Sequence, residues 1–108
     1  MKRLKANNEI EEDIKRIIEE ERYNCSVEEF ENSDEVDWNK ISVFQDLSEN
    51  FIREFQDKVD WEWISIEQNL SEDFIREFQD KVDWRRISRF QDLSENVVKE
   101  FKDKGYIK

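Results

Sequence analysis

Few residues of this chain could take part in chemistry. The sequence contains no histidine and one cysteine, Cys25, so imidazole-based triads and histidine metal sites are excluded. A thiol without a neighbouring base is poorly activated, and Cys25 directly precedes an expected helix start, where packing explains it. The one glycine, Gly105, lies near the C-terminus, so no glycine-rich phosphate loop is present. We therefore expect no enzyme and no cofactor.

Carboxylates are abundant, and one pair recurs. Asp57 with Asp60 is repeated as Asp80 with Asp83. Such a pair could begin a hydrolytic or metal site, but the central glycine of a calcium loop is missing. Asp60 and Asp83 are also explained as helix caps. We therefore expect no metal site and interpret these pairs as structural.

A 23-residue unit, present three times without insertion, must position these residues. The copies are VDWNKISVFQDLSENFIREFQDK at 36–58, VDWEWISIEQNLSEDFIREFQDK at 59–81 and VDWRRISRFQDLSENVVKEFKDK at 82–104. Each copy has two cap signals, an aspartate after a valine and a serine after a leucine. We predict a helix of about eight residues, a tight turn and a second helix of about nine. The predicted caps are Asp37, Asp60, Asp83, Ser48, Ser71 and Ser94.

Helices this short are marginal in isolation, so tertiary packing must hold them. The second helix of the first copy offers Phe51, Ile52 and Phe55 as one inward face. Each copy also has a tryptophan just after its aspartate cap. We expect these rings to lie between hairpins, each stacking against the next unit: Trp38, Trp61 and Trp84.

Residues 1–35 do not carry the motif. Asn8 with Glu11 and Ser26 with Glu29 fit capping boxes, which predict one helix from Asn8 to about Arg22 and a second over 27–32. We interpret 1–35 as an N-terminal capping hairpin. Residues 105–108 form an expected C-terminal cap, since a glycine commonly ends a helix.

Together these patterns predict an all-α single domain over 1–108. We expect a short α-solenoid of about four stacked helical hairpins with eight helices, because each repeat can bury its apolar face only against its neighbours.

The charge of the chain is strongly acidic and unevenly spread. The net charge is −11; residues 1–35 carry twelve acidic and six basic residues, and the second copy seven and two. This composition argues against phosphate-backbone and anionic-lipid binding and favours a protein partner with a basic surface. No apolar run is long enough for a membrane span and no signal peptide is visible, so we expect a cytoplasmic protein without membrane contact.

Positions that differ among the copies are the best candidates for partner binding, because the shared positions are explained by the fold. The fourth, fifth and eighth positions of each copy lie on the first helix, away from its isoleucine and tryptophan, and should form one outer ribbon. They are Asn39, Lys40 and Val43, then Glu62, Trp63 and Ile66, then Arg85, Arg86 and Arg89.

Trp63 leaves two interpretations open. Lys40 and Arg86 occupy its position in the other copies, which favours an exposed ring that anchors a partner together with Ile66. The ninth position holds Phe44, Glu67 and Phe90. Because positions five and nine share a helix face, Trp63 could instead cover the place that phenylalanine covers elsewhere.

The repeat resembles a short helical-hairpin repeat of uncharacterised giant-virus, phage and bacterial proteins, over residues 36–104. The resemblance implies a viral or mobile-element source, and small acidic phage proteins are often inhibitors, anti-CRISPR proteins among them. We therefore expect a non-enzymatic inhibitor of a host nucleic-acid-handling protein, such as a defence nuclease, acting in the host cytoplasm. Its acidic segment 9–35 and second copy (Glu62, Glu67, Glu72, Asp73) would meet a basic groove.

Two alternatives stay open. One is a structural or self-associating scaffold, with a homodimer formed through the ribbon around Trp63. The other is a nucleic-acid contact at Arg85, Arg86 and Arg89, although arginines in an acidic protein more often pair with neighbouring acids.

Overall fold

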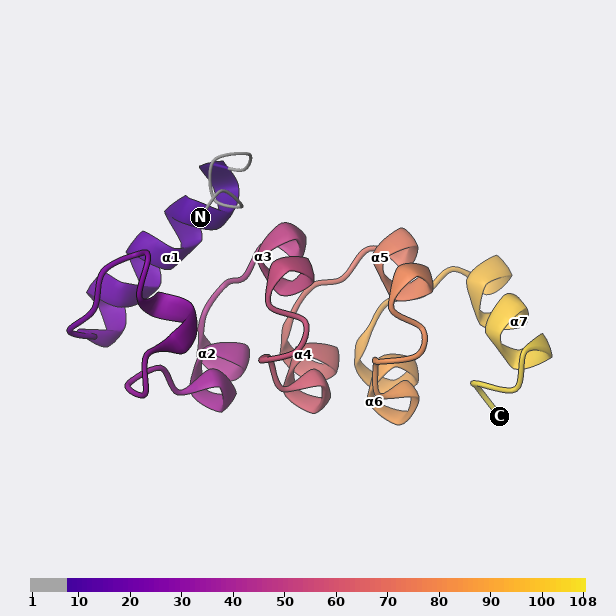
Figure 1. Ribbon diagram of the computed structural model, residues 1–108. Coiled ribbons are helices and arrows are strands. Elements are labelled where there is room, and N and C mark those ends of the chain that lie inside the picture. Colours follow the sequence, from indigo (N-terminus) through magenta and orange to yellow (C-terminus); the bar gives the residue numbers. More distant parts are fainter. Residues whose placement is uncertain (1–7) are drawn as a thin grey trace. The chain divides into compact units, whose positions relative to one another are not determined.

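The computed structural model describes residues 8–108 and shows the predicted all-α class (Figure 1). These residues contain seven α-helices, one 3₁₀ turn and no strand. They divide into two compact units, unit 1 ending at Val59 and unit 2 spanning Asp60–Lys108. Unit 1 contains α1 (Asn8–Glu21), the 3₁₀ turn η2 (Phe30–Asn32), α2 (Trp38–Phe44) and α3 (Glu49–Glu54). Unit 2 contains α4 (Trp61–Glu67), α5 (Glu72–Glu77), α6 (Trp84–Phe90) and α7 (Glu95–Asp103).

All six predicted repeat caps are confirmed. The aspartate carboxylates of the first helices accept hydrogen bonds from backbone N–H groups two or three residues on, and the serine hydroxyls of the second helices do the same. Ser48, for example, accepts from the Phe51 N–H at 3.0 Å. Such caps satisfy N–H groups that have no partner inside the helix. The side chain of Asn8, the expected cap of α1, lies outside the described residues.

The second helices of the first two copies are shorter than predicted. α3 and α5 have six residues each, and only α7 reaches nine. After α3 the chain turns, with the Val59 N–H donating to the Phe55 carbonyl at 3.1 Å, and Val59 becomes buried. The same turn buries Val82. α3 and α5 therefore end early, since the chain must turn to bury the valine that begins the next copy.

The second helix predicted over 27–32 is wrong. The capping box is present, since the Ser26 N–H donates to Glu29 at 2.9 Å and the Glu29 N–H donates to the Ser26 hydroxyl at 3.2 Å. Only a turn and the 3₁₀ segment η2 follow it. Ser33 is extended, and its hydroxyl accepts from the Glu35 N–H at 3.1 Å. Asparagine, serine and aspartate in a row bond to nearby backbone and compete with the helix.

The tryptophans pack within their own hairpins. The Trp61 ring lies 5.3 Å from the Phe78 ring and 6.2 Å from the Phe74 ring, all in the second copy. Trp84 lies 4.5 Å from Phe101 in the third copy. These ring contacts differ from the expected stacking on the next unit. A side chain in the first turn of a helix leans back toward the helix N-terminus, which brings it over the second helix of its own hairpin.

Trp38 follows the same arrangement in unit 1. Its ring lies 5.3 Å from Phe55, and it also meets the fully buried Phe30 of the N-terminal segment at 5.4 Å. Aromatic pairs at these separations add to the free energy of burial. Phe30 therefore packs η2, which lies outside the repeat, against the aromatic core of unit 1.

The predicted C-terminal cap is confirmed. Gly105 has φ +89°, and the Tyr106 N–H donates to the Phe101 carbonyl at 2.9 Å. The Gly105 N–H donates to the Lys102 carbonyl at 3.0 Å, which completes a Schellman motif. Tyr106 then stacks on Trp84 with ring centroids 5.0 Å apart.

Consecutive hairpins stack in unit 2. α4 and α6 lie side by side, and the backbone N–H of Asp83 donates to the buried hydroxyl of Ser65 at 3.0 Å. Gln91 donates to the carbonyl oxygens of Ser65 and Gln68, and it accepts from the Leu70 N–H. In unit 1, α1 packs beside α3. A continuous solenoid through both units, as one domain, stays a prediction.

Candidate protein-binding surface

The predicted ribbon is a continuous surface in unit 2, because α4 and α6 lie side by side. A guanidinium nitrogen of Arg86 on α6 lies 2.7 Å from a carboxylate oxygen of Glu62 on α4, and a second is 3.6 Å from Asp83. Arg86 thus pairs with neighbouring acids, as one of the open interpretations expected. We call this surface the α4/α6 ribbon: Glu62, Trp63, Ile66, Glu67, Arg85, Arg86, Arg89 and Phe90.

The ribbon has charged edges and a partly buried apolar centre. Glu62, Glu67, Arg85 and Arg89 are exposed, while Trp63, Ile66 and Arg86 are partly buried. Trp63 is therefore not a freely exposed ring. The second interpretation was that Trp63 covers the place that phenylalanine covers in the other copies. It loses support, because Phe90 at the ninth position is itself 52% exposed and covers little of the protein surface.

Two exposed phenylalanines were missed by the sequence reasoning. Phe44 is 73% exposed and Phe90 is 52% exposed, and both hold the ninth position. In the second copy this position is Glu67, also exposed. A position that is phenylalanine in two copies and glutamate in the third is one that solvent reaches. This difference among the copies could have predicted that the two phenylalanines are exposed.

The same helix face in unit 1 is tied to the end of α1. The Lys40 ammonium lies 3.1 Å from a carboxylate oxygen of Glu21, and the side chain of Gln45 donates to the other oxygen at 2.9 Å. The hydrogen bond to Glu21 and its charge raise the pKa of Lys40. Val43 is partly buried. The exposed ring of Phe44 therefore belongs to a helix, α2, that these two contacts join to the end of α1.

Exposed acids are numerous in the N-terminal segment. Residues 8–35 contain twelve acidic and three basic residues. Lys15 and Arg16 are paired with Glu11 and Asp13 on α1 itself. Five exposed carboxylates make no ion pair with another described residue. We call them the acidic face: Glu12, Glu19, Glu20, Glu28 and Asp34.

Two carboxylates that we expected to meet a partner also make contacts within unit 2. Glu72 accepts from the Ser94 N–H at 2.6 Å and from its hydroxyl at 3.2 Å, so it holds the start of α7. Asp73 pairs with Arg76 at 2.8 Å. In unit 1, Asp13 similarly accepts from the Ser48 N–H at 3.1 Å. Sequence reasoning could not identify the partners of Glu72 and Asp13, because these partners are distant in the chain.

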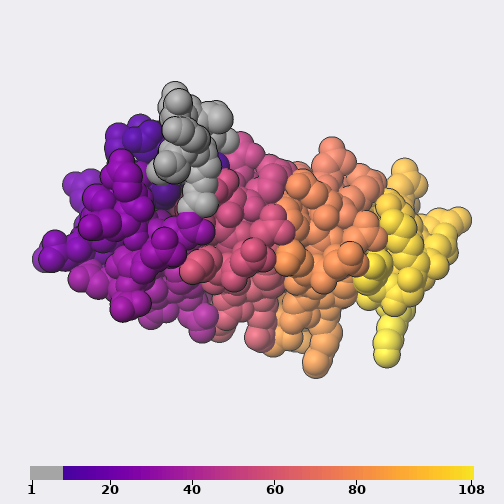
Figure 2. All heavy atoms as spheres, in the orientation of Figure 1, coloured from indigo at the N-terminus to yellow at the C-terminus, as the bar shows by residue number. Residues whose placement is uncertain are grey.

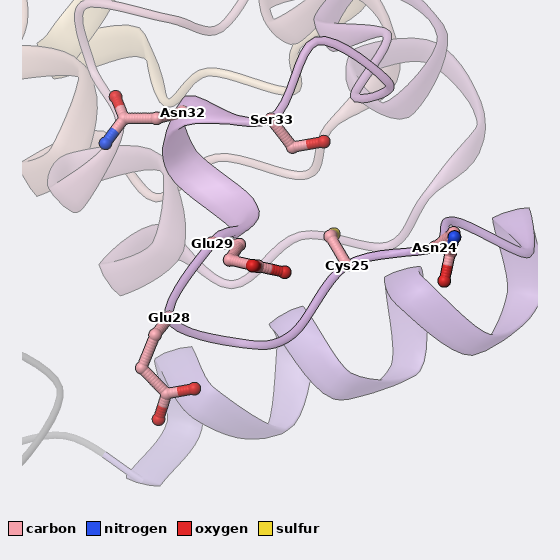
Figure 3. Close-up of a pocket in the computed structure, with 6 residues that line it drawn as sticks. All are labelled: Asn24, Cys25, Glu28, Glu29, Asn32 and Ser33. Atoms are coloured by element: carbon pink, nitrogen blue, oxygen red, sulfur yellow. The ribbon is translucent and has the colours of Figure 1, made fainter.

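The surroundings of Cys25 do not activate its thiol. Figure 3 shows the side chains that line the pocket around it, Asn24, Cys25, Glu28, Glu29, Asn32 and Ser33. Burial raises the pKa of the Cys25 thiol, and nearby Glu35 and Glu29 add to this effect. A thiol held in its protonated form is a poor nucleophile. Within residues 8–108, no group of three potential metal ligands lies close together.

A second hollow lies on α7 in unit 2. Its volume is about 410 Å³, and it is lined by Leu93, Glu95, Val98, Lys99, Lys102 and Asp103.

Among the described helices, none has the length and apolar composition of a bilayer span. Comparison with protein-family models, curated proteins and solved structures finds no match.

Proposed function

We propose that this chain is a non-enzymatic protein-binding module, and that its partner is a nucleic-acid-handling protein with a basic surface. The observation that carries the proposal is the acidic face. Its five carboxylates are exposed and without ion pairs to described residues, whereas many of the other acids cap helices or pair with lysine and arginine. Carboxylates that make no ion pair with a described residue are available to a cationic partner.

The acidic face would act mainly on association. A field of one sign raises the rate at which an oppositely charged partner is captured, and it repels nucleic acid from the same groove. Glu19 and Glu20 lie in the last turns of α1, next to the Glu21 that holds Lys40. An acidic patch and the exposed ring of Phe44 therefore belong to one region of unit 1. Exposed aromatic rings are frequent anchors in interfaces.

The α4/α6 ribbon is a second contact region of the proposal. Trp63 and Ile66 offer apolar area between charged neighbours, and Arg85 and Arg89 are exposed beside them. These arginines can bond to acids of a partner, which suits the rim of a protein interface.

The proposed mode of action is inhibition by occupying a basic nucleic-acid channel. The resemblance of the repeat to phage and giant-virus sequences supports a viral or mobile-element protein that acts in the host cytoplasm, in the manner of anti-CRISPR proteins. The absence of histidine and the protonated state of Cys25 support binding rather than catalysis.

Displacement of labelled nucleic acid tests the proposal. The chain is titrated into a panel of purified nucleic-acid-handling proteins, CRISPR effector nucleases among them, each carrying fluorescent DNA or RNA, and anisotropy is recorded. We expect displacement from at least one of them, weakened as salt rises.

A charge-matched pair of variants locates the contact. Glu19→Gln with Glu20→Gln should weaken displacement about fivefold, while Asp92→Asn with Asp103→Asn, an equal change in unit 2, should change it by less than about twofold. The proposal is contradicted if displacement is unchanged by salt, by the Glu19→Gln with Glu20→Gln variant and by Trp63→Ala. It is also contradicted if the chain displaces nucleic acid from no protein of the panel.

A further inference from the structure

The α7 end of unit 2 has an apolar surface that the proposed function does not use. Leu93 and Val98 are partly exposed there and line the hollow of about 410 Å³. α7 is the last helix of unit 2, and no described helix of that unit lies beyond it (Figure 1). Figure 2 shows the C-terminal residues, in yellow, at the surface of this unit.

The preceding hairpin shows what such a face receives. Leu70 and Ile75 hold the same positions one copy earlier, and they are 8% and 0% exposed. The following hairpin of the same type lies over that copy: its Gln91 accepts from the Leu70 N–H at 3.3 Å, and its Ser94 donates to Glu72. The positions of Leu93 and Val98 are therefore ones that become buried where a further helix packs against them.

The C-terminal cap covers a different part of this end. Tyr106 stacks on Trp84 and meets the ring of Phe101 at 6.0 Å, and its hydroxyl donates to Asp80 at 3.1 Å. Val98 and Leu93 stay partly exposed beside it.

The placement of two opposite charges on α7 suits a second copy of the same end as the occupant. Residues 82–108 carry seven basic and five acidic residues, so the repulsion between two such ends is small compared with that between two whole chains of charge −11. On α7, Glu95 and Lys102 are seven residues apart with Val98 between them. In an antiparallel pair of α7 helices, each Glu95 faces Lys102 of the second copy, and the two Val98 side chains meet near the two-fold axis.

We propose that the α7 face is a self-association site at which two copies pair through antiparallel α7 helices. A head-to-tail arrangement fits less well, because α1 presents carboxylates such as Glu12 and Glu19 outward rather than apolar side chains that could fill the hollow. The site is separate from the α4/α6 ribbon and from the acidic face. It holds or fails independently of the proposed function.

Sedimentation velocity on the full chain, from about 10 μM to about 1 mM, tests the site. We expect a monomer that becomes a dimer with concentration. Lys102→Glu and Glu95→Lys should each weaken the dimer at least about tenfold, because each places like charges opposite one another. The double variant, Glu95→Lys with Lys102→Glu, should restore it, and circular dichroism checks that each variant is folded.

Apolar and ribbon variants complete the test. Val98→Asp should abolish the dimer, while Trp63→Ala leaves it unchanged. A monomer at every concentration overturns the proposal. Growth beyond a dimer, a dimer that the double variant fails to restore, or a dimer lost in Trp63→Ala but kept in Lys102→Glu overturns it as well, the last in favour of the ribbon.

Discussion

The side-chain amide of Gln91 donates a hydrogen bond to the carbonyl oxygen of Gln68 at 2.8 Å, and the two residues hold the same position in consecutive copies. The same amide donates to the Ser65 carbonyl at 2.9 Å, and the side-chain oxygen accepts from the Leu70 N–H. One glutamine thus satisfies three backbone groups where α4 ends, which joins the two hairpins of unit 2.

Removing this amide should destabilise the protein. Gln91→Ala leaves three partly buried backbone groups without their partner, and we expect the free energy of unfolding to fall by about 1–3 kcal/mol. Urea denaturation measures the change. Asn96→Ala, which removes an exposed amide on α7, is the matched control and should change stability by less than about 0.5 kcal/mol. Equal effects of the two variants would contradict the role of Gln91.

Arg22 ends α1 in a conformation that suits glycine. Its φ is 60°, and the Tyr23 N–H donates to the Ile18 carbonyl at 3.0 Å. A side chain in the left-handed region costs about 1 kcal/mol relative to glycine. We expect Arg22→Gly to raise the free energy of unfolding by about that amount. Lys15→Gly, in the middle of α1, should lower it by about 1 kcal/mol, and a loss of stability in both variants contradicts the prediction.

Burial separates Phe90 from Ile87 on the same helix. Ile87 is fully buried, so Ile87→Ala should cost about 2–5 kcal/mol in thermal or urea unfolding. Phe90 is 52% exposed, and Phe90→Ser should cost less than about 0.5 kcal/mol. A cost for Phe90→Ser comparable to that of Ile87→Ala would show that the ring is packed and not available to a partner.

The ion pair between Arg76 and Glu100 predicts a pH effect in unit 2. Partial burial alone would raise the pKa of Glu100, but hydrogen bonds from Arg76, at 3.0 Å, and from Lys104 outweigh it and lower the pKa. The stability from this pair is therefore fully present above about pH 4.3, the ordinary glutamate pKa. It is lost as the pH falls through the lowered pKa of the folded state.

Carboxyl carbon NMR titration measures this pKa directly. Glu100 should titrate below the ordinary glutamate range in the native protein, and Arg76→Met should move its midpoint upward. Arg85→Met, which removes an exposed guanidinium on α6, should leave the midpoint in place. If Arg76→Met has no effect, the lowered pKa does not come from the ion pair.

Helix starts were predictable from sequence because a cap is a local device. The side chains of Ser48 and Asp83 bond to N–H groups three residues on, so the pattern contains both partners. The failed helix at 27–32 was local too. Its capping box is present, but the Ser33 hydroxyl accepts from the Glu35 N–H and so competes with the helix.

Contacts between residues that are distant in the chain could not be predicted from such local patterns. The position of Trp61 over Phe78 depends on how the chain turns after α4, and periodicity does not contain this. Likewise, the contact of Glu72 with Ser94, 22 positions further on, depends on the fold of the chain between them. The exposure of Phe44 was the most informative feature missed, since apolar residues at helical spacing usually indicate a core.

The carboxylate of Glu72 at the start of α7 bears on how such a chain can change in length. The residue that holds the next hairpin and the serine that it holds occur at fixed places in every copy, with Glu49 and Glu95 at the position of Glu72. Both partners of the contact between the second and third copies in unit 2 are thus part of the repeat itself. We therefore expect that duplication of a whole 23-residue unit would supply both partners of a new contact at once, without a further compensating mutation.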